Sequence, residues 1–289
     1  MSEIFQQFLN VLFLASIYCL IAAGLSLIYG IMEIFNFAQG NIYALGAYLV
    51  YFLTTLPVIS QSFLLVSMLA VLSMGLLGIV IDLLCFRPLK GTPHVNYFVV
   101  ALGLLMFLEG LIVILFGPDY KEVRPPIEMT FSYGDVTISF QRLLVILGTA
   151  IVLAVLYLFI KRTKWGAMLE AMSQNHELAA TIGINLNRMS LIAFMISTAL
   201  AGFAGVIISP VSFVYPEMGG MPLLIAFAAI IFGGMSSLGG AVLGAFIMAF
   251  VQVFSTQYIS EVMSSMFIFG IMIIALIFKP EGLMGAKRT

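Results

Sequence analysis

Three long stretches of the chain contain no charged residue, and this feature constrains the fold more than any other. They cover residues 34–81, 189–216 and 218–260. Because a helix that crosses the hydrocarbon core of a bilayer needs about 20 apolar residues, the first and last stretches each have room for two crossings. Soluble core helices keep a polar face and strands of membrane barrels alternate in polarity, whereas these stretches do neither. We therefore predict an all-α, polytopic integral membrane protein, with residues 1–289 forming one transmembrane domain.

Nine apolar segments are candidates for membrane-spanning helices, and two of them are short. The predicted spans are residues 8–30, 41–57, 62–86, 95–117, 143–160, 189–209, 222–234, 238–257 and 262–278. Glycine and polar residues flank the short segments 41–57 and 222–234. Short, glycine-interrupted segments in both halves of a chain point to a translocation path. Since residues 31–57 can form a full span or a re-entrant pair, we expect about eight to ten transmembrane helices, including short or broken ones.

The distribution of lysine and arginine predicts the orientation, because these residues favour cytoplasmic loops. Nine of the 12 lie in or beside residues 87–94, residues 161–188 and the C-terminal end. We therefore place these segments, including the C-terminus, on the cytoplasmic side of the inner or plasma membrane, and residues 118–142 outside. Alternating residues around Gly134 predict a small hairpin in this external loop. The first 30 residues lack the basic region of a signal peptide and are predicted to form the first span.

The sequence lacks the motifs that carry common enzymatic chemistry. It has no His-Glu-x-x-His pair and no Walker A loop, and no Gly-x-Ser-x-Gly element. Its two cysteines, Cys19 and Cys85, lie apart in apolar sequence, which favours neither a disulfide nor a metal site. We expect no enzymatic activity, no metal and no cofactor on this chain, and the net charge of −1 gives no sign of nucleic-acid binding.

Three carboxylates interrupt the apolar spans. An ionisable residue at the centre of a lone helix costs roughly 2.5–3.5 kcal/mol on insertion scales, so such residues face protein or water. We expect Asp82 to pair with Arg87 near the cytoplasmic interface. Glu109 lies deeper and is a candidate for the translocation path, whereas Glu33 lies at its cytoplasmic mouth. An ion-coupled secondary transporter that uses Glu109 or Glu33 is therefore one alternative function, and a membrane scaffold without transport is another.

Residues 161–188 form a long segment of mixed polarity between two apolar spans. Asn175 can cap a helix over residues 176–182, and Gly183 can end it in the left-handed conformation. Ala179 and Ala180 would present a small, smooth surface. We predict that this segment docks a cytoplasmic partner. A helix that only lies on lipid is the alternative, although such helices have a stronger apolar face.

Small residues recur at spacings that let helix backbones approach closely. They are Gly202 with Gly205, and Gly240 with Gly244. Such pairs usually mark tight packing between membrane helices, and a moving gate on the same glycines is the alternative.

Several segments together resemble one family. Residues 177–184, Glu-x-Ala-Ala-x-x-Gly-Ile, resemble the cytoplasmic coupling-loop motif of ABC importer permeases. Further segments are similar to the permease subunits of high-affinity branched-chain amino-acid ABC transporters, in order and over almost the whole chain. These segments are residues 24–30, 36–48, 201–205, 233–241 and 278–283. The chain departs from the family at Ser236, where glycine is usual, and at Gln39, where histidine or another polar residue is common.

The resemblance implies a heteromeric importer embedded in membrane lipid. This chain would form the translocation path with a second, related permease or a second copy of itself. Two ATP-binding-cassette ATPase subunits would drive transport, and a soluble extracytoplasmic binding protein would deliver the solute. Branched-chain amino acids are the default solute, and other amino acids, urea and amides are alternatives. The residues implied in coupling to the ATPase are Glu177, Ala179, Ala180 and Gly183. The residues that we predict for the path or gate are Tyr29, Asn36, Gln39, Gly40, Asn41, Tyr43, Glu109, Gly233, Gly234 and Ser236.

Overall fold

The computed structural model describes residues 2–56, 62–133, 136–279 and 282–284. Each of the nine predicted spans corresponds to a helix in it. These helices are α1 (Ser2–Met32), α2 (Gln39–Thr55), α3 (Phe63–Ile81), α4 (His94–Phe116), α5 (Phe140–Arg162), α8 (Leu186–Ile208), α9 (Gly220–Gly233), α10 (Leu238–Tyr258) and α11 (Glu261–Phe278). Six of the described helices are long and apolar enough to cross a membrane. Helix α9 and residues Met263–Phe278 of α11 are also apolar but shorter. The prediction of an all-α membrane protein with some short helices is confirmed.

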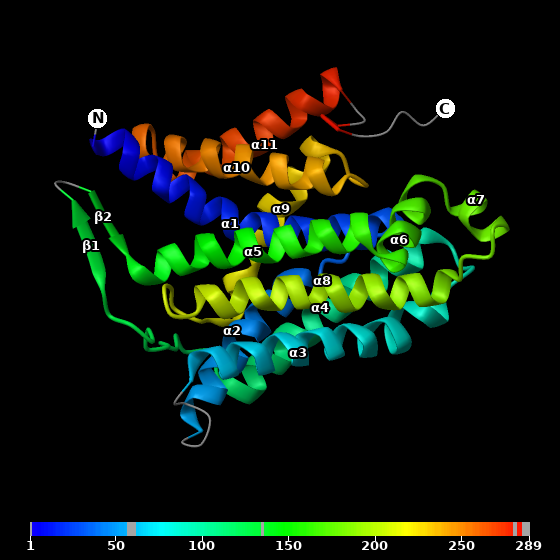
Figure 1. Ribbon diagram of the computed structural model, residues 1–289, viewed down its shortest axis with the longest axis horizontal. Coiled ribbons are helices and arrows are strands. Elements are labelled where there is room, and N and C mark those ends of the chain that lie inside the picture. Colours follow the sequence, from blue (N-terminus) through cyan, green and yellow to red (C-terminus); the bar gives the residue numbers. More distant parts are fainter. Residues whose placement is uncertain (1, 57–61, 134–135, 280–281, 285–289) are drawn as a thin grey trace.

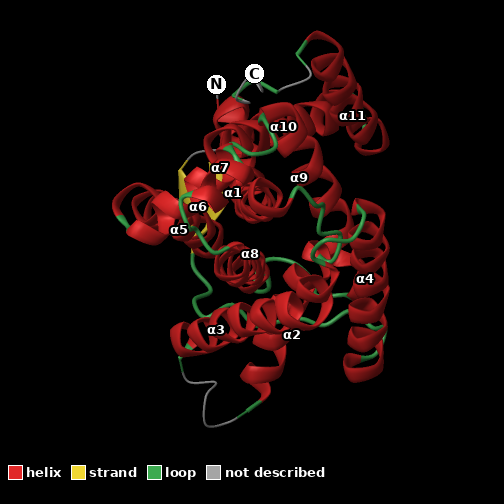
Figure 2. Cartoon of the chain, turned by 90° about the vertical axis from the view of Figure 1, so that its right-hand side faces the viewer, coloured by secondary structure: helices red, strands yellow, loops and turns green. Residues whose placement is uncertain are grey.

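Helices α1, α5, α8 and α10 run lengthwise beside one another in one bundle (Figure 1), whereas α4 is inclined to them (Figure 2). The start of α1 lies at the end of the bundle that carries strands β1 (Thr130–Tyr133) and β2 (Val136–Ser139). Two short helices, α6 (Lys164–Gln174) and α7 (His176–Thr181), lie at the opposite end. Viewed along the bundle, α8 occupies the middle, where it packs on α1, α2 and α3 (Figure 2).

Helices α4 and α5 lie at the edge of the bundle and keep most of their apolar surface exposed. Met106 and Ile114 of α4 are 72% and 82% exposed, and Ile151 of α5 is 63% exposed. A soluble protein rarely exposes a continuous apolar surface of this kind, so these faces must contact lipid or another subunit.

Glycines allow the central helices to approach one another at backbone distance. A Cβ atom on Gly205 of α8 would overlap the carbonyl oxygen of Tyr43 in α2, and one on Gly244 of α10 would overlap that of Ala229 in α9. Small residues at such crossings let van der Waals packing hold membrane helices together. The predicted glycine pairs are therefore packing contacts in this structure.

Helix α2 begins halfway along the bundle. The amide nitrogen of Asn41 donates a hydrogen bond of 2.6 Å to the carbonyl of Leu105, the middle residue of α4. The Gln39 amide nitrogen contacts Ser197, the middle residue of α8. Gly40 packs against Gly219 in the short helix η3 (Pro216–Gly219), which leads directly into α9. Residues 33–38 therefore form a non-helical break that is followed by the short helix α2, and the start of α9 lies at the same depth as the start of α2.

The predicted hairpin is present and is attached to the start of α1. Strands β1 and β2 are antiparallel, with Thr130 opposite Ser139, while residues 134–135 at the tip lie outside the described residues. The Thr137 backbone nitrogen donates to Gln6 over 3.0 Å. The Arg142 guanidinium donates to Asn10 over 3.2 Å and lies 5.1 Å from the centre of the Phe13 ring.

Candidate coupling loop and broken-helix centre

The loop of residues 163–185 begins with a helix that the sequence analysis did not predict. Helix α6 follows α5 after Thr163, whose hydroxyl accepts a hydrogen bond of 3.0 Å from the Gly166 nitrogen. A Cβ atom on Gly166 would overlap the backbone of Ile160, and Lys161 pairs with Glu170 over 2.6 Å. These contacts fix α6 against the end of α5.

Helix α7 has the caps that the sequence predicts. The Asn175 side chain accepts a hydrogen bond of 2.9 Å from the Leu178 nitrogen at the start of the helix. At its end, Gly183 has a φ of +85°. Its nitrogen donates to the Ala180 carbonyl over 3.0 Å, and the Ile184 nitrogen donates to the Ala179 carbonyl over 3.1 Å. This pair of bonds is the Schellman motif, which stops the helix and turns the chain toward α8.

The outward face of α7 differs from the prediction. Ala180 is exposed, but Ala179 is only 3% exposed, so the expectation that both alanines form one surface is wrong for Ala179. Successive helical residues point about 100° apart, which turns Ala179 inward and leaves Leu178 and Ile182, four residues apart, at 65% and 75% exposure. The side chain of Glu177 lies outside the described part of the structure.

The inward face of the loop packs on the last turn of α1. One buried cluster joins α1, the loop and the start of α8. Its members are Ile31, Leu169, Met172, Ala179, Met189 and Ala193. A Cβ atom on Gly30 of α1 would lie 3.0 Å from the Ser173 side chain of α6. The loop therefore contacts the bundle immediately before the break between α1 and α2.

Polar residues of the break satisfy one another inside the protein. The Gln39 amide nitrogen donates to the Ser197 carbonyl and hydroxyl oxygens, both at 2.9 Å. The Asn36 amide nitrogen donates to the Gln39 side-chain oxygen over 3.4 Å, and the Asn36 oxygen accepts from the Ala38 nitrogen over 3.2 Å. Asn36, Gln39 and Asn41 are all buried, as is Tyr43. In this conformation these predicted path residues hold the break together, and none of them is exposed.

An aromatic cluster that the sequence analysis did not single out covers the break. Phe35 lies 4.9 Å from Tyr29 and 5.5 Å from Phe227, measured between ring centres. Phe37 lies 5.0 Å from Phe227 and 5.3 Å from Phe98. The cluster links the break to α9 and to the first turns of α4, and Phe98 is 48% exposed.

The turn after α9 is covered by the end of the chain. Gly234 has a φ of +115°, and Ser236 beyond it is exposed. The Leu283 nitrogen donates to the Phe232 carbonyl over 2.9 Å, and the Met284 nitrogen donates to the Gly233 carbonyl over 2.8 Å. Residues 233–241 and 278–283, two of the segments that carry the family resemblance, are therefore far apart in sequence but in contact in the structure.

The three carboxylates of the spans have different surroundings. Asp82 is fully buried and accepts a hydrogen bond from the Ser190 hydroxyl of α8, so the expected pair with Arg87 is wrong. Asp82 is the first residue of a π-helical turn, η1 (Asp82–Phe86), and Arg87, which follows the last residue of this turn, is exposed. Glu109 is half-buried on α4, and Glu33 is half-buried at the break with a φ of +54°.

Comparison with known proteins identifies the family. The family described as "Branched-chain amino acid transport system / permease component" matches residues 7–276. The chain belongs to this family. The permease is 29% identical to the high-affinity branched-chain amino acid transport system permease protein BraD of Pseudomonas aeruginosa, over 98% of this chain and 96% of that protein.

Two further relatives come from one organism, Escherichia coli K12. Both are named as high-affinity branched-chain amino acid transport system permease proteins. The permease is 27% identical to LivH, over 100% of this chain and 99% of LivH. It is 26% identical to LivM, over 95% of this chain and 69% of LivM. The chain is thus a multi-pass membrane permease component that resembles two different permeases of one organism.

Proposed function

We propose that this permease carries branched-chain amino acids across the membrane as one subunit of an importer driven by separate ATPase subunits. The family and the names of its relatives support the solute class. Because LivH and LivM are two different proteins of one organism, we further propose that a second, related permease completes the path. In this arrangement the hairpin end of the bundle faces outside and receives a solute-loaded binding protein, while α6, α7 and the C-terminus face the cytoplasm.

The observation that carries this proposal is the contact between the loop and the last turn of α1. The exposed face of α7, with Leu178, Ala180 and Ile182, would contact the ATPase. Its buried face packs on Ile31, two residues before Glu33. A movement of α7 imposed by ATP binding would therefore reach the α1–α2 break through packed side chains, which transmit displacement because protein interiors are close-packed.

The path would open where the break, α9 and α4 meet. The predicted path residues Asn36, Gln39 and Asn41 are buried there, and the rings of Phe35 and Phe37 pack on Phe227 of α9. A closed state of this kind must exchange its internal hydrogen bonds for new ones when the path opens. Binding of the solute by an external protein leaves the permease itself with little need for tight binding.

Purification with associated proteins tests the assembly. The permease, extracted from its own membrane in mild detergent, should bring down an ATPase and a second permease that mass spectrometry identifies. A cysteine placed at Ala180 should crosslink to that ATPase, whereas one placed at the exposed Val155 of α5 should not, with Cys19 and Cys85 replaced by serine. Recovery of the permease alone, with leucine uptake driven by an ion gradient, would overturn the proposal.

A further inference from the structure

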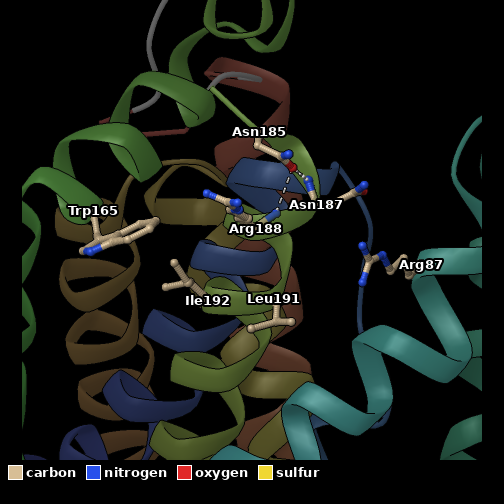
Figure 3. Close-up of a pocket in the computed structure, with 7 residues that line it drawn as sticks. All are labelled: Arg87, Trp165, Asn185, Asn187, Arg188, Leu191 and Ile192. Atoms are coloured by element: carbon tan, nitrogen blue, oxygen red, sulfur yellow. Dashed lines mark hydrogen bonds between the residues drawn. The ribbon is translucent and has the colours of Figure 1, made fainter. Parts of the chain in front are cut away.

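A pocket opens at the α6–α7 end of the bundle, beside the loop but separate from the outward face of α7. Its volume is about 410 Å³. It lies between the helical turn η2 (Arg87–Leu89), the start of α6 and the first turns of α8. The lining residues are Arg87, Trp165, Asn185, Asn187, Arg188, Leu191 and Ile192 (Figure 3).

The polar part of the pocket is cationic. Arg87 and Arg188 approach it from two different elements (Figure 3), and neither makes an ion pair within the described residues. Guanidinium groups stay protonated at all physiological pH values. Next to them, the Lys90 ammonium donates a hydrogen bond of 2.7 Å to Asn187. Burial lowers the pKa of Lys90, the buried Asp82 carboxylate opposes this shift, and Arg87 adds to it. Because Arg87 and Arg188 line the pocket and keep their charge, the pocket favours an anion.

The other part of the pocket is apolar, and the helix surfaces next to it are apolar and exposed. Leu191 and Ile192 lie one turn further along α8 than Arg188 and are half-buried. Trp165, at 44% exposure, lines the opposite side, and tryptophan is enriched where a membrane meets water. On the neighbouring helices Leu84 and Leu158 are 72% and 53% exposed. The two arginines thus lie where apolar helix surfaces end, which is where we expect the lipid headgroups of a surrounding membrane.

We propose that this pocket binds the headgroup phosphate of an anionic phospholipid, with the first acyl carbons against Leu191 and Ile192. Arginine forms bidentate hydrogen bonds with phosphate, and basic pockets between transmembrane helices bind anionic headgroups. A carboxylate of a partner protein would bind the two arginines but would make no contact with Leu191 and Ile192, the apolar residues of the pocket. A bound lipid would contact η2 on one side of the pocket and Trp165 and the start of α8 on the other. It would therefore restrict the movement of the two ends of the loop of residues 163–185. This inference needs only that the permease lies in a membrane, and it stands apart from the solute and the partners proposed above.

Lipid binding to the purified permease tests this proposal. Native mass spectrometry in detergent should show retained phosphatidylglycerol and little phosphatidylcholine. The double variant Arg87→Gln and Arg188→Gln should bind phosphatidylglycerol roughly thirtyfold more weakly, because each cation near an anionic lipid surface contributes on the order of a fivefold factor. Arg162→Gln is the matched control, since Arg162 is an exposed arginine at the same end of the bundle and outside the pocket. Size-exclusion profiles and helicity establish that both variants fold.

Three results would overturn the proposal. The first is equal phosphatidylglycerol binding by the double variant and the unchanged permease. The second is binding of inorganic phosphate that displaces phosphatidylglycerol at equal concentration, which would assign the pocket to a free anion. The third is lipid binding that persists in the double variant while a co-purified ATPase is lost, which would assign the two arginines to a protein carboxylate.

Discussion

Gly183 allows the coupling hypothesis to be tested with a change whose energy follows from the geometry. Its φ of +85° lies in the left-handed region, and nothing lies within 4 Å of the place where a Cβ atom would be. A substitution there meets no steric obstacle, so its cost is confined to the backbone. That cost is roughly 1–2 kcal/mol for most L-residues and higher for a β-branched residue. Asparagine tolerates this conformation well.

We therefore expect Gly183→Val to destabilise the Schellman turn by at least about 1–2 kcal/mol, which lowers the ratio of formed to unformed turn by a factor of roughly 5 to 30. In proteoliposomes that contain the complete importer, uptake per ATP hydrolysed should fall, by up to this factor, while the amount of assembled complex stays unchanged. Gly183→Asn, the matched control, should keep most of the coupling. Normal coupling in the valine variant would refute the role of this turn, and equal loss in both variants would show that the glycine acts through something other than its conformation.

Three further changes test the bundle and the path. Gly205→Ala should sharply reduce the fraction of monodisperse permease in size-exclusion chromatography, because the added Cβ would overlap the Tyr43 backbone. The control Gly103→Ala should not, because nothing lies near the place where its Cβ would be. Similar profiles for the two variants would contradict the packing argument. Gln39→Leu removes the donor to Ser197 and should cost about 1–3 kcal/mol, visible as a lower unfolding temperature in detergent; an unchanged temperature would mean that the break is held elsewhere. Glu109→Gln should leave ATP-driven uptake within about twofold, and abolished uptake with intact ATPase activity would revive the ion-coupled alternative.

The spans were predictable because hydropathy alone limits where helices can lie. The caps of α7 were predictable for a different reason, since Asn175 and Gly183 act on backbone groups close to them in sequence. The break between α1 and α2 remained ambiguous in the sequence. Only the contacts of Gln39 and Asn41 with the middles of α8 and α4 fix its depth, and such pairings between distant segments leave no periodic signal.

The errors have the same origin. Asp82 and Arg87 were paired because they are close in the chain, but a π-helical turn separates their directions, and Ser190 reaches Asp82 from α8. Ala179 was expected to share a surface with Ala180, yet it is buried by a cluster whose other members come from three helices, α1, α6 and α8. The aromatic contacts around Phe227 also join residues from separate segments. The roles assigned to the loop and path residues stay predictions until the experiments above are done.

The capping of α9 by the end of the chain has a consequence for biosynthesis. The Phe232 and Gly233 carbonyls receive their hydrogen bonds from Leu283 and Met284, which lie after α10 and α11 in the sequence and therefore leave the ribosome later than α9. Until then the end of α9 has unpaired carbonyl groups beside a glycine-rich turn, and a chain that lacks Leu283 and Met284 never covers them. A change that displaces residues 282–284 would therefore impair folding of the permease, and not only its transport activity.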